Sequence, residues 1–161
     1  MNRKHTYNLD LHWTGNKGTG TSSYTAYERS HSILVAGKAE IAASSDVVFR
    51  GEKAKHNPEE LLVASVSSCH MLSYLHVCSS AGIVVGGYQD HATGIMEETP
   101  DGGGRFIEVT LHPIVTVSES SMIDLANQLH EKANQLCFIA NSVNFKVAHF
   151  PHCKVAESGG E

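Results

Sequence analysis

The feature that most constrains this chain is residues 57–75, which have the pattern of a buried helix with a thiol at its centre. Pro58 suits the first turn of a helix, and Glu59 and Glu60 place negative charge at the positive end of the helix dipole. Apolar residues then occupy nearly every face, so such a helix must be buried on all sides. Cys69 lies inside it and is either inert packing or a nucleophile in a dry site.

The helix is expected to run from about residue 58 to residue 81, because Gly82 is a natural C-terminal cap. A single small sheet cannot cover a helix that has no wide polar face. A second layer from the same chain or from a partner chain must complete the burial, and we therefore expect an intimate, intertwined homodimer.

The remaining pattern predicts an α+β fold built from antiparallel sheets around this long buried central helix. Ser121 and Asp124 resemble a capping box, and the apolar spacing that follows predicts an amphipathic helix up to Leu136. Residues 37–56 have the composition of a long irregular connection. Alternation of apolar and polar residues predicts strands over residues 7–13, 21–29, 31–36, 83–97, 105–117 and 143–147.

Length and composition favour one soluble domain. A chain of 161 residues can bury a sufficient core without disulfides or metals, so we expect a single domain over residues 1–153 and a disordered tail over residues 154–161. The net charge of -5 leaves no basic stripe for a phosphate backbone, and nucleic acid is not expected as a partner.

The sequence also predicts a cytoplasmic protein that does not contact a membrane. The N-terminus lacks the apolar core of a signal peptide, and no run approaches the ~20 residues needed to cross a bilayer. Cytoplasmic thiols are kept reduced, so the cysteines are expected to be free, catalytic or metal-binding, and these are Cys69, Cys78, Cys137 and Cys153.

A second thiol stands at a junction between elements. Cys137 follows the predicted amphipathic helix and precedes the last predicted strand. One thiol in a buried helix and another at a junction are what a peroxidatic and resolving cysteine pair requires. Cys78 lies about 13 Å further along the first helix than Cys69, so these two cannot bond within it, and Cys78 is expected to be packing.

The segment Asn57–Leu61 followed by Cys69, together with Cys137 late in the chain, resembles the OsmC/Ohr family of organic hydroperoxide reductases. The likeness extends over about residues 7–150. It implies a cofactor-free and metal-free homodimeric peroxidase of the OsmC-like fold, with active sites at the dimer interface. On this reading Cys69 attacks an organic hydroperoxide, becomes a sulfenic acid and condenses with Cys137, and an external dithiol then reduces the disulfide.

A buried thiol needs a cation beside it, because an unperturbed thiol, with a pKa of about 8.5, is largely protonated at neutral pH and burial favours that form. The family resemblance implies an arginine held by the glutamate that corresponds to Glu59. Arg50 is the first candidate and Arg29 the rival. Glu59 stands about 15 Å before Cys69 along a straight helix, so the arginine must span this gap or a partner chain must shorten it.

Several apolar side chains are expected to wall the substrate pocket, which would favour alkyl hydroperoxides over hydrogen peroxide. The expected wall residues are Leu62, Val66, Leu72 and Phe138. Two positions depart from the common family pattern: His70 follows the first cysteine where an apolar residue is usual, and Phe138 follows the second where proline is usual. His70 is a candidate to tune the thiolate or contact substrate, although a histidine on a packed helix is more often a core residue.

Two alternatives remain open from the residues alone. One is a zinc protein that uses Cys69 and His76, which share a helix face, with the cluster His149, His152 and Cys153. The other is a non-catalytic dimer of the same fold that binds a small apolar ligand in the interface pocket.

Overall fold

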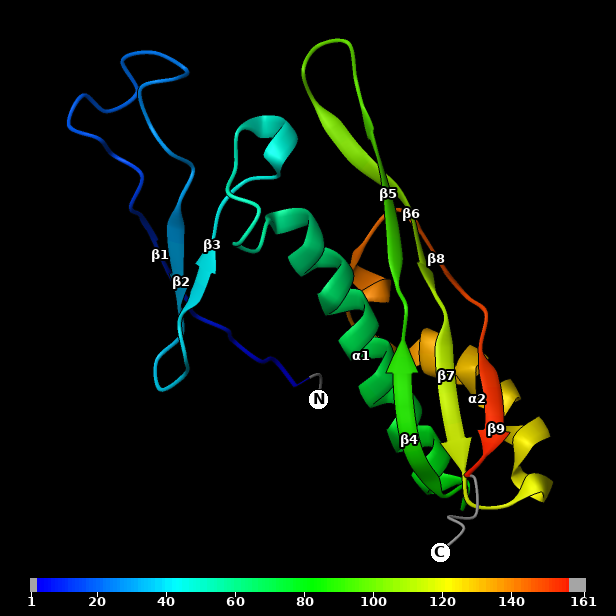
Figure 1. Cartoon of the computed structure of the whole chain (residues 1–161). Helices are drawn as coiled ribbons and strands as arrows, with labels where there is room; N and C mark the ends of the chain where they lie inside the picture. The colour runs from blue at the N-terminus through cyan, green and yellow to red at the C-terminus, as the bar shows by residue number, and fades with distance from the viewer. Residues whose placement is uncertain (1–2, 157–161) are drawn as a thin grey trace, which may run out of the picture. The chain divides into compact units, whose positions relative to one another are not determined.

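The computed structural model describes residues 3–156, which form two compact units divided between Leu61 and Leu62. The single domain over residues 1–153 stays a prediction. The long helix α1 (Pro58–Ser80) begins in the first unit and continues through the second (Figure 1).

The first unit is a three-stranded antiparallel sheet in the order β1 (Asp10–Trp13), β2 (His31–Leu34), β3 (Ile41–Ala43), followed by the short helix η1 (Val47–Phe49). The irregular connection predicted for residues 37–56 therefore contains β3 and η1. The strand predicted for residues 21–29 is wrong. The guanidinium of Arg29 donates to the carbonyl oxygens of Tyr24 and Tyr27, which folds this segment back on itself.

The start and end of α1 agree with the sequence prediction. The Asn57 side chain accepts a 2.7 Å hydrogen bond from the Glu60 amide, and the Glu60 carboxylate accepts one from the Asn57 amide, which together make a capping box. Beyond the helix Gly82 has φ 73°, a conformation that glycine adopts without steric cost. Burial on all sides is not observed in the single chain, because Leu72 is 63% exposed.

By length and composition alone, α1 is long and apolar enough to cross a membrane, with a mean hydropathy of 1.4 over its best window. The expectation that no segment approaches that length is therefore corrected. A core helix of a soluble protein satisfies the same criterion. The face of α1 that carries His70, Tyr74 and Cys78 is buried within the second unit.

The second unit contains two three-stranded sheets. One has the order β4 (Val85–Asp90), β7 (Pro113–Val117), β9 (His152–Val155), and the other the order β5 (Thr93–Glu98), β6 (Gly104–Leu111), β8 (Lys146–His149). In each sheet the last-named strand pairs in parallel with the middle one, so the sheets are mixed and not purely antiparallel as predicted.

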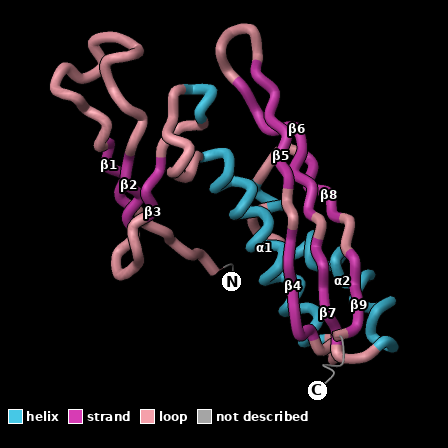
Figure 2. The backbone as a smooth tube through the Cα atoms, viewed as in Figure 1, coloured by secondary structure: helices cyan, strands magenta, loops and turns pink. Residues whose placement is uncertain are grey.

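The strands predicted over residues 83–97 and 105–117 each break into two. Figure 2 shows β5 continuing from β4, and β6 leading into β7, with the breaks at the same level. The His112 amide donates to the Asp90 carboxylate at 2.7 Å instead of to a neighbouring strand, and Pro113 has no amide proton to donate. The strand predicted over residues 143–147 is observed as β8, at residues 146–149. The further strand β9 follows Pro151 and includes residues 154 and 155, which corrects the start of the predicted tail. Residues 157–161 lie outside the described part of the chain.

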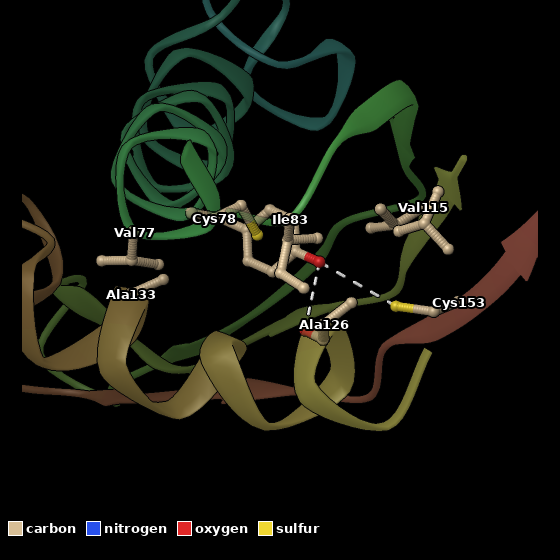
Figure 3. Close-up of a cluster of buried hydrophobic side chains, with 9 residues drawn as sticks. Val77, Cys78, Ile83, Val115, Ala126, Ala133 and Cys153 are labelled. Carbon is tan, nitrogen blue, oxygen red and sulfur yellow. Dashed lines mark hydrogen bonds between the residues drawn. The ribbon is translucent and has the colours of Figure 1, made fainter. Parts of the chain in front are cut away.

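Helix α2 (Ile123–Leu136) follows the short helix η2 (Ser120–Met122) and packs against α1 and β9 in the core of the second unit. The capping box predicted at Ser121 does not form, because the N-cap residue is Met122 and makes no side-chain cap hydrogen bond. Figure 3 shows Val77 of α1 facing Ala133 of α2, while Cys153 of β9 points toward Ala126.

Candidate functional site

The two sulfur atoms singled out by the sequence lie side by side in the second unit. Cys69 is half-buried on α1, and Cys137 is wholly buried at the C-cap position of α2. The two thiols are in hydrogen-bonding contact, although they stand 68 residues apart in the chain. Free thiols in contact can be converted to a disulfide with little movement of the backbone.

The turn after α2 positions both sulfur atoms. Cys137 leaves the helix with an extended conformation, φ −70° and ψ 110°, and its carbonyl oxygen accepts a hydrogen bond from the Asn141 amide. This turn aims two backbone amides at sulfur. The Ile139 N–H donates to Cys69 Sγ over 3.5 Å, and the Ala140 N–H donates to Cys137 Sγ over 3.4 Å.

The two thiols have different electrostatic surroundings. Burial, assisted by the hydrogen bond with Cys69, raises the pKa of Cys137 to about 11. Cys137 therefore stays a protonated thiol at neutral pH and can donate its hydrogen to Cys69. Cys69 is thus contacted by two hydrogen-bond donors, the Cys137 thiol and the Ile139 amide.

A pocket of about 550 Å³ opens beside Cys69. Leu72 and Phe138 lie on its wall, as do two further apolar residues from the end of α2 and the following turn. The residues that line the pocket are Ser65, Ser68, Cys69, Leu72, Ser73, His76, Leu136, Phe138 and Ile139. The pocket is therefore a mainly apolar cleft with a hydroxyl and imidazole stripe along one helix.

Sequence reasoning missed the serines of this pocket, Ser65, Ser68 and Ser73, and paired His76 with Cys69 only as a zinc ligand. Ser65 and Ser73 fall four positions from Cys69 and His76 falls seven, which is the spacing of one helix face, and Ser68 directly precedes Cys69. That spacing was readable from the sequence.

Three residues predicted to line the pocket lie elsewhere. His70 and Val66 are completely buried in the core and do not line the pocket, and Val66 packs with Val109 and Leu111. Leu62 is half-buried and is not part of the pocket wall. Since His70 neither lines the pocket nor bonds to Cys69, its predicted contact with substrate is corrected.

His70 instead belongs to a buried histidine cluster. Its Nε2 atom lies 3.0 Å from Nδ1 of His130, and both rings are fully buried. Tyr74 stacks on His130 with ring centroids 3.8 Å apart, and His149 lies 5.5 Å from the His70 ring. Burial lowers the pKa of His70 to about 4 and that of His130 to about 3, so both are neutral at physiological pH.

The predicted cation and its anchor lie in the first unit or at its boundary. Arg29 stacks on the rings of Tyr24 and Tyr27, with its guanidinium carbon 4.3 and 4.2 Å from their centroids. Arg50 has φ 66°, the only positive φ among the described residues other than glycine. Glu59 has one buried carboxylate oxygen that finds no hydrogen-bond partner within residues 3–156.

The other two cysteines form a separate buried group. Tyr74 lies between them, with its hydroxyl 3.9 Å from Cys153 Sγ, and burial raises the pKa of both Cys78 and Cys153. Cys153 thus points into the core while Cys69 faces the pocket. Across the described residues, no group of three or more His, Cys, Asp or Glu side chains is placed to hold a metal ion, so the residues named in the zinc alternative are not brought together.

Known protein families and solved structures include relatives of this chain. The family model for OsmC-like proteins matches residues 51–149. An OsmC-like protein of unknown function from Vibrio cholerae is 29% identical, with TM-score 0.80, and the alignment covers 92% of this chain and all of that one. No curated protein matches the chain.

Two further solved structures support the fold. An organic hydroperoxide resistance protein from Elizabethkingia anophelis has TM-score 0.70 at 24% identity, covering 94% of this chain and all of that one. An organic hydroperoxide resistance protein from Legionella pneumophila has TM-score 0.69 at 19% identity, covering 96% and 100%. Because the family model spans more than half of the residues, the chain belongs to the family of OsmC-like proteins.

Proposed function

We propose that this protein is a thiol peroxidase that reduces organic hydroperoxides to alcohols. The observation that carries the proposal is the contact between Cys69 and Cys137 beside a mainly apolar pocket. One thiol faces the pocket and a second, buried thiol is in contact with it, which is the arrangement that a peroxidatic and resolving pair requires.

The proposed reaction has three steps. The Cys69 thiolate attacks the terminal oxygen of the hydroperoxide, the O–O bond breaks, and the leaving alkoxide takes a proton to become an alcohol. Cys69 is now a sulfenic acid. The Cys137 sulfur attacks it, a disulfide forms and water leaves, and two thiols of an external dithiol then reduce the disulfide to regenerate both cysteines.

The protonated state of Cys137 suits this sequence. Before reaction it donates a hydrogen bond that favours the Cys69 thiolate, and it does not compete as a nucleophile because its pKa is about 11. After reaction it is already in contact with the sulfenic acid that it must attack. The Ile139 amide supplies a second, fixed donor to the Cys69 sulfur.

We further propose that Arg50 supplies positive charge to the Cys69 thiolate, with Glu59 as its anchor. Arg29 is the weaker candidate, since its guanidinium is already bound by two carbonyl oxygens and two aromatic rings. Arg50 is held in a sparsely populated backbone region, as functional residues often are, and its guanidinium lies 6.0 Å from the Tyr24 ring.

The proposal extends to partners and location. The exposed apolar residues Leu72 and Phe138 agree with a homodimer that covers this face of α1, and their side chains favour alkyl hydroperoxides over hydrogen peroxide. The protein is proposed to act in the cytoplasm, where an external dithiol is available to reduce the disulfide.

Stopped-flow kinetics test the proposal with the wild type and with Cys69→Ser and Cys137→Ser. The wild type is expected to consume cumene hydroperoxide faster than hydrogen peroxide, and Cys69→Ser is expected to be inactive. Cys137→Ser should react once and accumulate a sulfenic acid, visible as an added oxygen by mass spectrometry. Cys78→Ala is the matched control, because it removes a thiol from the same helix and should keep activity.

The same experiment separates catalysis from simple binding. A non-catalytic protein that holds a small apolar ligand in this pocket would bind cumyl alcohol without consuming the hydroperoxide. Peroxide consumption that survives in Cys69→Ser would overturn the mechanism.

A further inference from the structure

We propose that His76 is a specificity-determining residue which selects hydroperoxides that carry a carboxylate about 10 Å from the peroxide group. The inference rests on the proposed function, because it assumes that the peroxide reacts at Cys69. The far end of the pocket would then bind the substrate and take no part in cleavage of the peroxide bond.

The first support is the position of His76 along the pocket. It stands seven residues after Cys69 on α1 and lines the same cleft. Seven residues make almost two helical turns, so the two side chains share a face and lie about 10 Å apart along the helix axis. An extended chain of about nine bonds covers this distance, since three bonds extend roughly 3.5 Å in an extended backbone.

The second support is the order of polar and apolar groups in the cleft. Leu72 stands between Cys69 and His76 on the helix, and Leu136 and Phe138 form an apolar part of the pocket wall. A ligand with a polar group at each end and an alkyl chain between them matches this arrangement. Ser73 adds a hydroxyl beside the His76 end.

The third support is charge. Besides Cys69, His76 is the one titratable side chain that lines the cleft, and no Asp or Glu lies on its wall. The His76 ring makes no hydrogen bond or ion pair with any residue in the range 3–156, so its ring N–H is free to donate. An imidazole and a serine hydroxyl complement a carboxylate, which accepts hydrogen bonds only.

The test compares one acid with its own ester. The substrates are 8-hydroperoxyoctanoic acid, its methyl ester and cumene hydroperoxide, and the proteins are the wild type, His76→Leu, His76→Gln and His91→Leu. His91 is an exposed histidine in the turn between β4 and β5, and it serves as the matched control.

We expect kcat/KM for the acid to exceed that for the ester about tenfold in the wild type, because hydrogen bonds to charged groups are among the strong ones. His76→Leu should abolish this preference by lowering kcat/KM for the acid to the value for the ester. His76→Gln should retain part of it, since an amide can still donate. Equal rates for acid and ester in the wild type, or equal losses for both in His76→Leu, would overturn the proposal.

A binding measurement keeps the two proposals distinguishable. In the Cys69→Ser background, titration calorimetry with 8-hydroxyoctanoate and its methyl ester measures the His76 contact without turnover. Tighter binding of the acid that is lost in His76→Leu supports the role of His76 even if no hydroperoxide is consumed. Equal affinity for acid and ester would refute it even if the peroxidase is active.

Discussion

The backbone N–H of Ile139 donates a hydrogen bond to Cys69 Sγ at 3.5 Å, from the same turn that carries Cys137. One short segment therefore supplies both the second thiol and a fixed dipole directed at the first. A backbone donor needs no side-chain ordering when charge develops on sulfur, so it favours the thiolate at no reorganisation cost.

Ile139→Pro removes this donor at a residue whose φ of −70° suits proline. We expect sulfenic acid formation to slow about tenfold at pH 7, because a hydrogen bond to a charged acceptor contributes ~1.5–3 kcal/mol. The rate should recover at higher pH, where the thiolate forms without help. Stopped-flow measurements across pH give the result.

Ile139→Ala is the matched control, since it shortens the side chain but keeps the amide. It should react nearly as fast as the wild type with cumene hydroperoxide. If both variants slow equally, the side chain and not the amide is responsible.

The different surroundings of the cysteines predict selective alkylation. Cys137, Cys78 and Cys153 are buried and their pKa values are raised, so each remains a protonated thiol. Iodoacetamide at pH 8 is therefore expected to modify Cys69 first in the folded protein. Peptide mass mapping with time should show the other three reacting only after denaturation. Modification of Cys137 as fast as Cys69 would contradict the assigned roles.

The boundaries of α1 could be read from the sequence because local signals determine them. The Asn57 cap and Gly82 act within one turn of the helix ends. The break at His112 was missed, because alternation continues through it and the competing acceptor, Asp90, is distant in sequence. Apolar–polar periodicity over such a stretch predicts a strand. It does not predict where a side chain, in place of the neighbouring strand, accepts the backbone hydrogen bond.

The site was partly predictable for the same reason. The pairing of Cys69 with Cys137 depended on family resemblance, since nothing local relates residues so far apart. The inward position of His70 was readable, because it falls four residues from both Val66 and Tyr74, which are buried with it. The uniformly apolar character of the helix obscured that face.

The proposed cation predicts unequal effects of arginine substitutions. Arg50→Ala should slow the reaction of Cys69 with cumene hydroperoxide by at least tenfold at pH 7, because it removes the charge that favours the thiolate. Arg29→Ala should mainly lower the free energy of unfolding, since this side chain bonds to the carbonyls of Tyr24 and Tyr27. Arg105→Ala is the control on β6 and should change neither quantity.

Stopped-flow rates and urea unfolding separate these outcomes. A large kinetic loss in Arg29→Ala with an unchanged unfolding curve would transfer the catalytic role to Arg29. Wild-type rates in both variants would remove the guanidinium from the mechanism.

The buried histidine pair predicts that the protein loses stability as the pH falls. Burial lowers the pKa of His70 to about 4 and of His130 to about 3, while a histidine in an unfolded chain titrates near 6.5. Below pH 6.5 the unfolded state therefore binds more protons than the folded state, and the free energy of unfolding decreases as the pH falls. Each histidine contributes a slope of up to ~1.4 kcal/mol per pH unit, down to about pH 4.

Urea unfolding at pH 7.5, 6.0, 5.0 and 4.5 measures this slope. His130→Gln removes one titrating group and should reduce the slope by about half, whatever its effect on stability at pH 7.5. His91→Gln changes an exposed histidine and should leave the slope unchanged. A wild-type slope that does not differ from that of His130→Gln would mean that the pair is charged in the folded core. That outcome is incompatible with rings whose second nitrogens, Nδ1 of His70 and Nε2 of His130, have no partner among residues 3–156.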